Sequence, residues 1–222
     1  MTTLEYAPGR HADVYADDRR PIVLLWHGTQ TDSRAAVAPL AESIAGHGLC
    51  VVAADWDSHA DDGGRADLLA SVEFARDRSP EGLILVGWSM GGLAAAGVTL
   101  EASRLGVHLL HTVCLAGAFT ARDPISGGPL TQSPLGAGEG TPFTLLHGTA
   151  DDVVPVEVSR DFAARLHDID WPVEVVELAT DHGAIAGAVY DPVADRYDPA
   201  TDDETLRVAT DVAARIAAVT GR

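Results

Sequence analysis

The sequence predicts an α/β fold in which a mostly parallel central sheet carries helices on both faces. Short apolar runs typical of strands alternate with longer stretches of helical periodicity along the 222 residues. Most of the strand-like runs are apolar at every position, which is typical of parallel strands buried on both faces. Neither an internal repeat nor an interdomain linker interrupts the alternation, so residues 1–222 are expected to form one domain.

The first half of the chain supplies alternating strands and helices. Strands are predicted from the apolar runs at 22–26, 49–54 and 83–86, and helices from the periodic stretches at 35–47 and 65–78. In the earlier helix, apolar residues recur at helical spacing, namely Val37, Leu40, Ala41 and Ile44. The weaker segments before residue 17 predict an antiparallel hairpin at the edge of the sheet.

The second half continues this pattern with one long interruption. An Ala-rich helix follows the strand at 83–86 and is expected to run to about Arg104. The remaining strands are predicted at 112–116, 143–146 and 173–178, and the remaining helices at 156–168 and 202–219. Between about Gly117 and Gly140 the chain is rich in Gly, Pro, Ser and Thr, and an irregular stretch of this length is often functional.

The charge balance excludes several classes of partner. The chain has 33 acidic residues against 15 basic ones, all of them Arg, which gives a formal net charge of −18. Such a surface repels nucleic acids and anionic membranes, because both require cationic groups on the protein. No apolar run approaches the roughly 18 residues of a membrane-spanning helix, and the N-terminus lacks the features of a secretory signal. The expected location is therefore the cytoplasm.

One segment combines a buried strand, a Gly-x-Ser-x-Gly motif and a helix. It reads Leu83-Ile-Leu-Val-Gly-Trp-Ser-Met-Gly-Gly92 and places Ser89 in a tight strand-to-helix turn. Such a turn exposes the hydroxyl to a base, while Gly87 and Gly91 leave room for crowded backbone. The N–H of Met90 at the start of the helix is positioned to stabilise negative charge on a substrate oxygen. Ser89 is therefore the candidate nucleophile.

With this motif the chain resembles the α/β-hydrolases, in which the nucleophile is followed along the chain by an acid and then by a histidine. The resemblance implies that His182, just beyond the last strand, is the base; His167, near the end of a predicted helix, is the alternative. This chain also has a stretch similar to the turn that carries the catalytic acid in these hydrolases, namely Leu145-Leu-His-Gly-Thr-Ala-Asp-Asp-Val-Val-Pro155. Asp151 occupies the matching position and Asp152 is the competing choice. Asp181 is interpreted as part of the local loop structure.

The resemblance also implies an oxyanion hole and a substrate site. Its donors are expected to be the amides of Met90 and Thr29, with Gln30 as the alternative to Thr29. His27 precedes the nucleophile and is interpreted as a residue that braces the loop. The candidates for an apolar lining of the substrate site, chosen by position, are Trp88, Phe119, Leu130, Leu135 and Ile185.

The strand order of these hydrolases gives a structural check on the two cysteines, Cys50 and Cys114. Both lie in apolar runs and are expected to be buried thiols. With the family's strand order, two strands separate the strands that carry them. At about 4.8 Å per strand the cysteines are roughly 14 Å apart, too far for a disulfide.

Among these hydrolases the chain is most similar to small uncapped members, such as dienelactone-hydrolase-like proteins and simple carboxylesterases. True dienelactone hydrolases use a cysteine nucleophile, so Ser89 departs from that pattern. The sequence between residues 116 and 143 is too short for a helical cap domain, which implies an open cleft for short acyl groups. The expected function is hydrolysis of a small-molecule ester through an acyl-enzyme.

Other functions on the same scaffold remain open. These are thioesterase, peptidase or amidase activity, or a catalytically silent binding protein. No cofactor is implied, and the acidic loop at 55–62 lacks the glycine and closing glutamate of a calcium-binding loop, so no metal is expected. The oligomeric state is left open.

Overall fold

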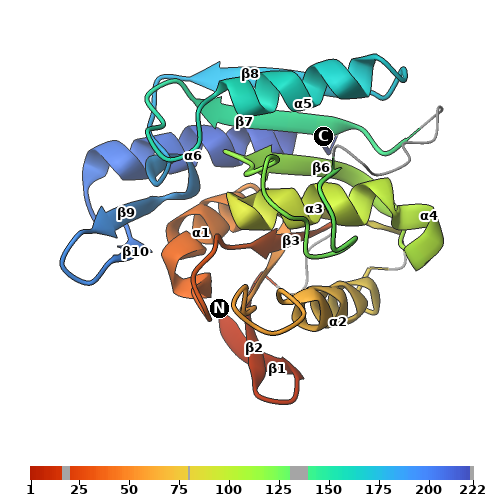
Figure 1. The fold of residues 1–222 in the computed structure, drawn as a ribbon. Coiled ribbons are helices and arrows are strands. Elements are labelled where there is room, and N and C mark those ends of the chain that lie inside the picture. The colour runs from red at the N-terminus through yellow and green to blue at the C-terminus, as the bar shows by residue number, and fades with distance from the viewer. Residues whose placement is uncertain (17–20, 80, 131–139, 221–222) are drawn as a thin grey trace.

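The computed structural model describes residues 1–16, 21–79, 81–130 and 140–220 (Figure 1). In this part of the chain the central sheet has eight strands in the order β1-β2-β4-β3-β5-β6-β7-β8. The six strands β3 to β8 are mutually parallel. The first two strands, β1 and β2, pair antiparallel with each other, and β2 pairs antiparallel with β4. Their bounds are β1 Thr2–Ala7, β2 Arg10–Tyr15, β3 Ile22–Trp26, β4 Cys50–Ala54, β5 Leu83–Trp88, β6 Leu109–Leu115, β7 Phe143–Gly148 and β8 Val173–Leu178.

The burial of each strand follows its place in the sheet. Every residue of β3, β4, β5 and β7 is buried, because helices cover both faces of these parallel strands. The edge strand β8 is only partly buried along its length. The predicted parallel sheet with an N-terminal antiparallel hairpin is confirmed.

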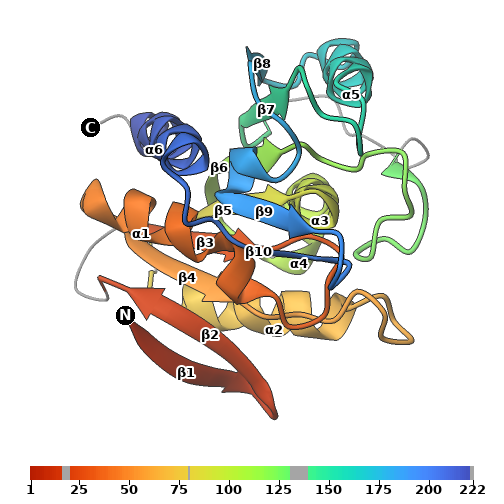
Figure 2. The same ribbon diagram turned by 90° about the vertical axis from the view of Figure 1, so that its left-hand side faces the viewer.

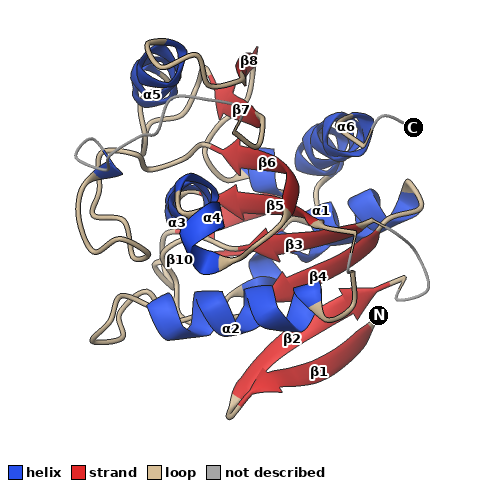
Figure 3. Ribbon diagram, turned by 90° about the vertical axis from the view of Figure 1, so that its right-hand side faces the viewer, coloured by secondary structure: helices blue, strands red, loops and turns tan. Residues whose placement is uncertain are grey.

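Helices cover the sheet in two layers (Figures 2 and 3). One face carries α1 (Ala38–Gly46), which begins after a short 3₁₀ turn η1 (Arg34–Val37), and α6 (Asp203–Ala218). The other face carries α2 (Arg65–Arg76), α3 (Met90–Leu100) and α5 (Glu157–His167). The side chain of Asp202 starts α6 by accepting the N–H of Thr205 at 2.9 Å. Each layer encloses its own apolar core against the sheet.

Two elements differ from the sequence-based expectation. The helix expected to run to about Arg104 is divided into α3 and α4 (Ala102–Leu105), because the buried face that packs on the sheet ends at Thr99 and α4 has no buried residue. A hairpin of β9 (Ala188–Asp191) and β10 (Arg196–Pro199) was not predicted. Its strands are too short and too polar to give a period-two signal.

The strand order also settles the relation between the cysteines. Cys50 on β4 and Cys114 on β6 are separated by β3 and β5, as expected, and both thiols are buried without a disulfide between them. Burial raises the pKa of the Cys114 thiol, so it stays protonated.

The loops that follow the parallel strands lie together at one edge of the sheet. β3, β5, β7 and β8 all point in the same direction, so the loops after their carboxyl ends gather there. In the described residues between β6 and β7, 116–130 and 140–142, no α-helix covers this edge. No helix in the described part of the chain is long and apolar enough to cross a membrane.

The contact between α6 and the sheet should contribute strongly to stability. Ile216 is fully buried in the core under α6, so Ile216→Ala should lower the free energy of unfolding by about 2–5 kcal/mol. Denaturant unfolding measures this change. The matched control is Val193→Ala, whose side chain is 95% exposed and which should change stability by less than about 0.5 kcal/mol. Equal effects of the two substitutions would contradict the assigned packing.

Candidate active site

Ser89 lies in a strained turn between β5 and α3. Its φ of 55° and ψ of −117° are unfavourable for any residue with a side chain. A Cβ at Gly87 would collide with the backbone of Gly91, and a Cβ at Gly91 would collide with the carbonyl oxygen of His27. Only glycine permits this close approach, as the sequence motif predicted. Ser89 itself is 8% exposed.

Asp151 lies in the loop after β7, with its side chain fully buried. One carboxylate oxygen, Oδ1, accepts the backbone N–H groups of Val153 at 2.9 Å and Val154 at 2.8 Å. Burial alone would raise the pKa of this carboxyl, but the interactions with His147 and His182 and the Val154 amide hold it well below its usual range. Asp151 is therefore ionised and fixed in orientation.

His182 lies in the loop after β8 and faces Asp151. Its Nδ1 is 2.7 Å from Asp151 Oδ2. Because a carboxylate only accepts, Nδ1 carries the proton of this bond and Nε2 is left to accept one in the neutral ring. The backbone brings the two loops together: the amides of Thr149 and Ala150 donate to the carbonyls of Leu178 and Thr180.

Trp88 connects the serine turn to the histidine loop. Its indole Nε1 donates to the backbone carbonyl of His182 at 2.8 Å, and the two rings lie 5.5 Å apart between centroids. Trp88 also packs edge-on against Tyr197 of β10. Since Trp88 directly precedes Ser89, these contacts hold the segments of Ser89 and His182 next to each other.

The loop after β3 lies against the serine turn. A Cβ built on Gly28 would be 3.4 Å from the Cβ of Ser89, so the neighbouring amide of Thr29 belongs to the same corner of the site. Met90 is the first residue of α3, and its N–H therefore has no acceptor within the helix. The side chain of Gln30 is engaged elsewhere, because it bonds both the N–H and the carbonyl of Tyr197.

His27 holds this loop in place. Its Nε2 accepts the backbone N–H groups of Ser33 and Trp56 at 3.2 Å each, and its Nδ1 lies 2.9 Å from the Gly28 carbonyl. Desolvation by complete burial lowers the pKa of His27 to about 3, so the ring is neutral and both of its nitrogens are occupied. It therefore acts as a brace, as its position in the sequence suggested.

The alternative residues take no part in the hydrogen bond between Asp151 and His182. Asp152 is exposed, and His167 is an exposed residue at the end of α5. Asp181 accepts the backbone N–H groups of Gly183 and Ala184, which is the local structural part assigned to it. The structure thus brings together Asp151 and His182 and leaves out Asp152 and His167.

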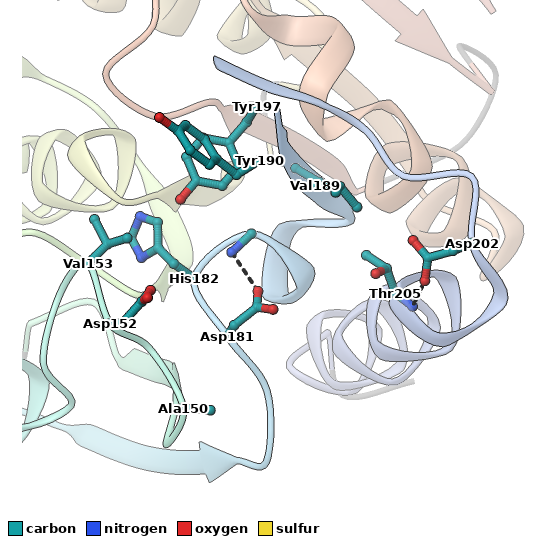
Figure 4. A pocket seen from close by; sticks show the side chains of 12 residues that line it. Ala150, Asp152, Val153, Asp181, His182, Val189, Tyr190, Tyr197, Asp202 and Thr205 are labelled. Carbon is teal, nitrogen blue, oxygen red and sulfur yellow. Dashed lines mark hydrogen bonds between the residues drawn. The ribbon is translucent and has the colours of Figure 1, made fainter. Parts of the chain in front are cut away.

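A pocket of about 720 Å³ opens beside His182 (Figure 4). Tyr190 and Tyr197 of the β9–β10 hairpin form one side of it, and Asp152 and Asp181 approach from the two loops. A second pocket of about 520 Å³ is bordered by Met90.

The residues expected to bind substrate lie in the core instead. Trp88, Phe119, Leu130 and Ile185 are only 2%, 4%, 1% and 0% exposed, and none of them lines either pocket. Leu135 lies outside the described residues. Phe119 stacks on Phe162 of α5, and Ile185 joins the core under α6. The prediction that these residues line the substrate site is wrong, because an apolar residue on a segment near the site can pack inward as readily as it can line a cleft.

The acidic loop after β4 is held by protein contacts. Asp55 forms an ion pair with the Arg34 side chain and accepts the Arg34 backbone N–H at 3.0 Å. Asp57 accepts from the Thr31 hydroxyl at 2.7 Å. Within the described ranges, no cluster of three or more His, Cys, Asp or Glu side chains is arranged to hold a metal ion.

Sequence reasoning missed two features of the site. No part was assigned to His147, although a histidine directly after Leu145 and Leu146 in a buried strand is a signal of a side chain held by specific contacts. The β9–β10 hairpin supplies the pocket tyrosines. Its turn is marked in the sequence by Asp191-Pro-Val-Ala-Asp195, and the Asp191 side chain accepts two backbone N–H groups there.

The lowered pKa of Asp151 predicts a pH dependence of stability. The folded state binds fewer protons than the unfolded state at this residue, so Asp151 stabilises the fold above the ordinary aspartate pKa of about 4 and less as the pH falls below it. The stability difference between wild type and Asp151→Asn should therefore shrink between about pH 5 and pH 3. Denaturant unfolding at several pH values measures it. Asp152→Asn, at the exposed neighbour, is the control; parallel curves for wild type and Asp151→Asn would contradict the prediction.

Comparison with known proteins identifies the fold. No protein-family model and no curated protein sequence matches the chain. Among solved structures, esterase 2 of Thermogutta terrifontis phosphoramylated by tabun matches with a TM-score of 0.73 at 20% identity, covering 99% of this chain and 94% of that one. The native form of this thermophilic Planctomycetes esterase gives 0.73 at 19% identity over 99% and 92% of the two chains, and the butyrate-bound form gives 0.72 at 19% over 99% and 94%. Together with the parallel sheet and the strand–turn–helix at Ser89, these matches establish that the chain has the α/β-hydrolase fold without a cap domain.

Proposed function

We propose that the protein is a serine hydrolase that cleaves small carboxylic esters of short acyl chains. The observation that carries the proposal is the 2.7 Å hydrogen bond between buried Asp151 and His182. Trp88 ties the His182 loop to the strained strand-to-helix turn of Ser89, because its indole donates to the His182 carbonyl. A carboxylate that holds a histidine in this way leaves Nε2 free to take a proton from a nucleophile.

The proposed reaction begins with attack on the ester carbonyl. Ser89 Oγ forms a bond to the carbonyl carbon while His182 Nε2 takes the hydroxyl proton. The carbonyl oxygen becomes an oxyanion, which the amides of Met90 and Thr29 stabilise. Asp151 keeps the imidazole in its tautomer and stabilises the imidazolium that forms.

The tetrahedral intermediate then collapses in the usual two-stage sequence. The bond to the alcohol oxygen breaks, and His182 gives its proton to that oxygen as the alcohol leaves. Water attacks the acyl-enzyme in turn, losing a proton to His182, and the carboxylic acid departs as the proton returns to Ser89 Oγ. No step needs a cofactor.

Three observations favour a short-chain ester as the substrate. The described residues between β6 and β7, 116–130 and 140–142, place no α-helix over the carboxyl edge of the sheet, which favours an open cleft. The solved esterase of similar fold binds propionate and butyrate, and it is phosphorylated by paraoxon. The net charge of −18 and the absence of lysine disfavour acyl-CoA, whose phosphates require cationic groups.

Removing the nucleophile tests the proposal directly. Ser89→Ala should lower kcat/KM for a short ester by about 10⁴-fold or more, because the attack on the carbonyl is lost. Circular dichroism should show an unchanged fold. A serine-directed phosphonate should label wild type and leave Ser89→Ala unlabelled. A variant that kept esterase activity would refute the assignment of Ser89, and an unlabelled, inactive wild type would favour a catalytically silent binding protein.

A panel of substrates tests the reaction class. Esters of a common alcohol, graded by acyl length, should show the highest kcat/KM for the short chains, because the described residues between β6 and β7 form no helix that would enclose a long one. Matched thioester and amide substrates separate the alternatives. Faster cleavage of the thioester or the amide would reassign the enzyme to those classes, and a preference for long chains would contradict the open cleft.

A further inference from the structure

His147 is a fully buried histidine at the carboxyl end of β7, four residues before Asp151. Its Nδ1 lies 2.7 Å from the Ser159 hydroxyl of α5, and its Nε2 lies 2.8 Å from the Val154 carbonyl oxygen and 3.3 Å from Asp151 Oδ2. The proposed mechanism does not use this ring. A buried imidazole bonded at both nitrogens beside a candidate acid calls for a physical explanation.

We propose that His147 is a positioning residue that holds the carboxylate of Asp151 toward His182 and tunes its charge. This inference rests on the proposed function, because it concerns the same acid–base pair.

The contacts fix which nitrogen of His147 carries a proton. The Val154 carbonyl and the Asp151 carboxylate are acceptors only, so the proton is on Nε2. This single N–H donates to the Val154 oxygen at 2.8 Å and also lies 3.3 Å from Asp151 Oδ2. In the neutral ring Nδ1 then accepts from the Ser159 hydroxyl. A continuous chain of contacts results: Ser159 to His147, His147 to Asp151, and Asp151 to His182.

His147 acts on Asp151 by two routes. Directly, its N–H points positive charge at Oδ2, the same oxygen that accepts from His182. Indirectly, it binds the carbonyl of Val154, whose own N–H donates to Asp151 Oδ1 at 2.8 Å. His147 therefore contacts one carboxylate oxygen itself, and it binds the residue whose amide donates to the other.

The electrostatic consequence has a definite sign. Stabilising the negative charge on Asp151 makes it a weaker base and lessens its pull on the proton of His182. Without His147, the pKa of Asp151 should rise, and the acid–base pair should take up a proton at higher pH. The other charged and titratable groups around the pair are Asp152 and Asp181 on its loops, Tyr197 and Tyr190 of the hairpin, and Glu177 of β8, which the Arg160 side chain neutralises.

The test compares variants that keep or remove the donor. His147→Gln retains an N–H group at similar reach, and His147→Leu removes it. Ser159→Ala removes only the partner of Nδ1. The matched control is His111→Leu on the adjacent strand β6, where the imidazole contacts Thr144 at 2.9 Å away from the site.

Two measurements distinguish a positioning role of His147 from a purely structural one. The first is kcat per active site, with sites counted by phosphonate titration and the pH profile of kcat/KM recorded. His147→Leu should lose roughly 10- to 100-fold in kcat with little change in KM, as expected for a misaligned catalytic pair. Its acid limb should move to higher pH. The second readout is the downfield proton resonance of His182 Nδ1–H in the NMR spectrum, which needs no turnover; it should shift in His147→Leu and stay near wild type in His147→Gln.

The outcomes decide the proposal. Rescue of kcat and of the resonance by His147→Gln, with intermediate values for Ser159→Ala and wild-type values for His111→Leu, would support it. Equal loss in His147→Gln and His147→Leu, or an unchanged acid limb and resonance in His147→Leu, would overturn it. If His147→Leu does not fold, the other two variants decide. Wild-type kcat and resonance in His147→Gln with lowered kcat and a shifted resonance in Ser159→Ala would support the proposal, and wild-type values in Ser159→Ala would overturn it. Failure of the proposed function is recognised separately, by a wild type that shows no esterase activity or by a Ser89→Ala variant that keeps it.

Discussion

Asp151 and His182 lie on loops that follow two adjacent parallel strands, β7 and β8, and one hydrogen bond of 2.7 Å joins them. The rest of the site is arranged around this contact. The backbone of the acid loop donates to the carbonyls of the histidine loop, and Trp88 binds the His182 carbonyl from the serine side. The bond is strong because the carboxylate is buried and ionised, which is stable only when every oxygen has a donor. Removing one donor would leave a buried charge unsatisfied.

The turn at Ser89, in contrast, holds a backbone conformation that is unfavourable on its own. The turn persists because β5 is buried throughout its length and α3 is buried from Gly91 to Thr99, so the flanking elements fix its geometry. Gly87 and Gly91 make this possible by admitting backbone where a side chain would clash. Rigid elements on both sides thus place the candidate nucleophile at the carboxyl edge of the sheet.

Buried histidines do much of the positioning in the loops. His27 gathers two amides and a carbonyl around the loop after β3, and His147 connects α5, the Val154 carbonyl and Asp151. A neutral imidazole suits this task because it offers one donor and one acceptor on a rigid ring, without the cost of burying a charge. His27, His147 and His182 therefore have different roles at one edge of the sheet. Their surroundings, and not their residue type, determine those roles.

The sequence by itself determined the α/β architecture, the alternation of buried strands and helices, and the segment that carries Ser89, because apolar periodicity and glycine spacing are local properties of the chain. With the family's order of residues it also indicated Asp151 and His182. Only the tertiary structure decided that Trp88, Phe119 and Ile185 pack inward, that the β9–β10 hairpin lines the pocket, and that His147 contacts the acid. These depend on where side chains point and on which loops meet after distant strands have paired. Such contacts join residues far apart along the chain, and no local pattern records them.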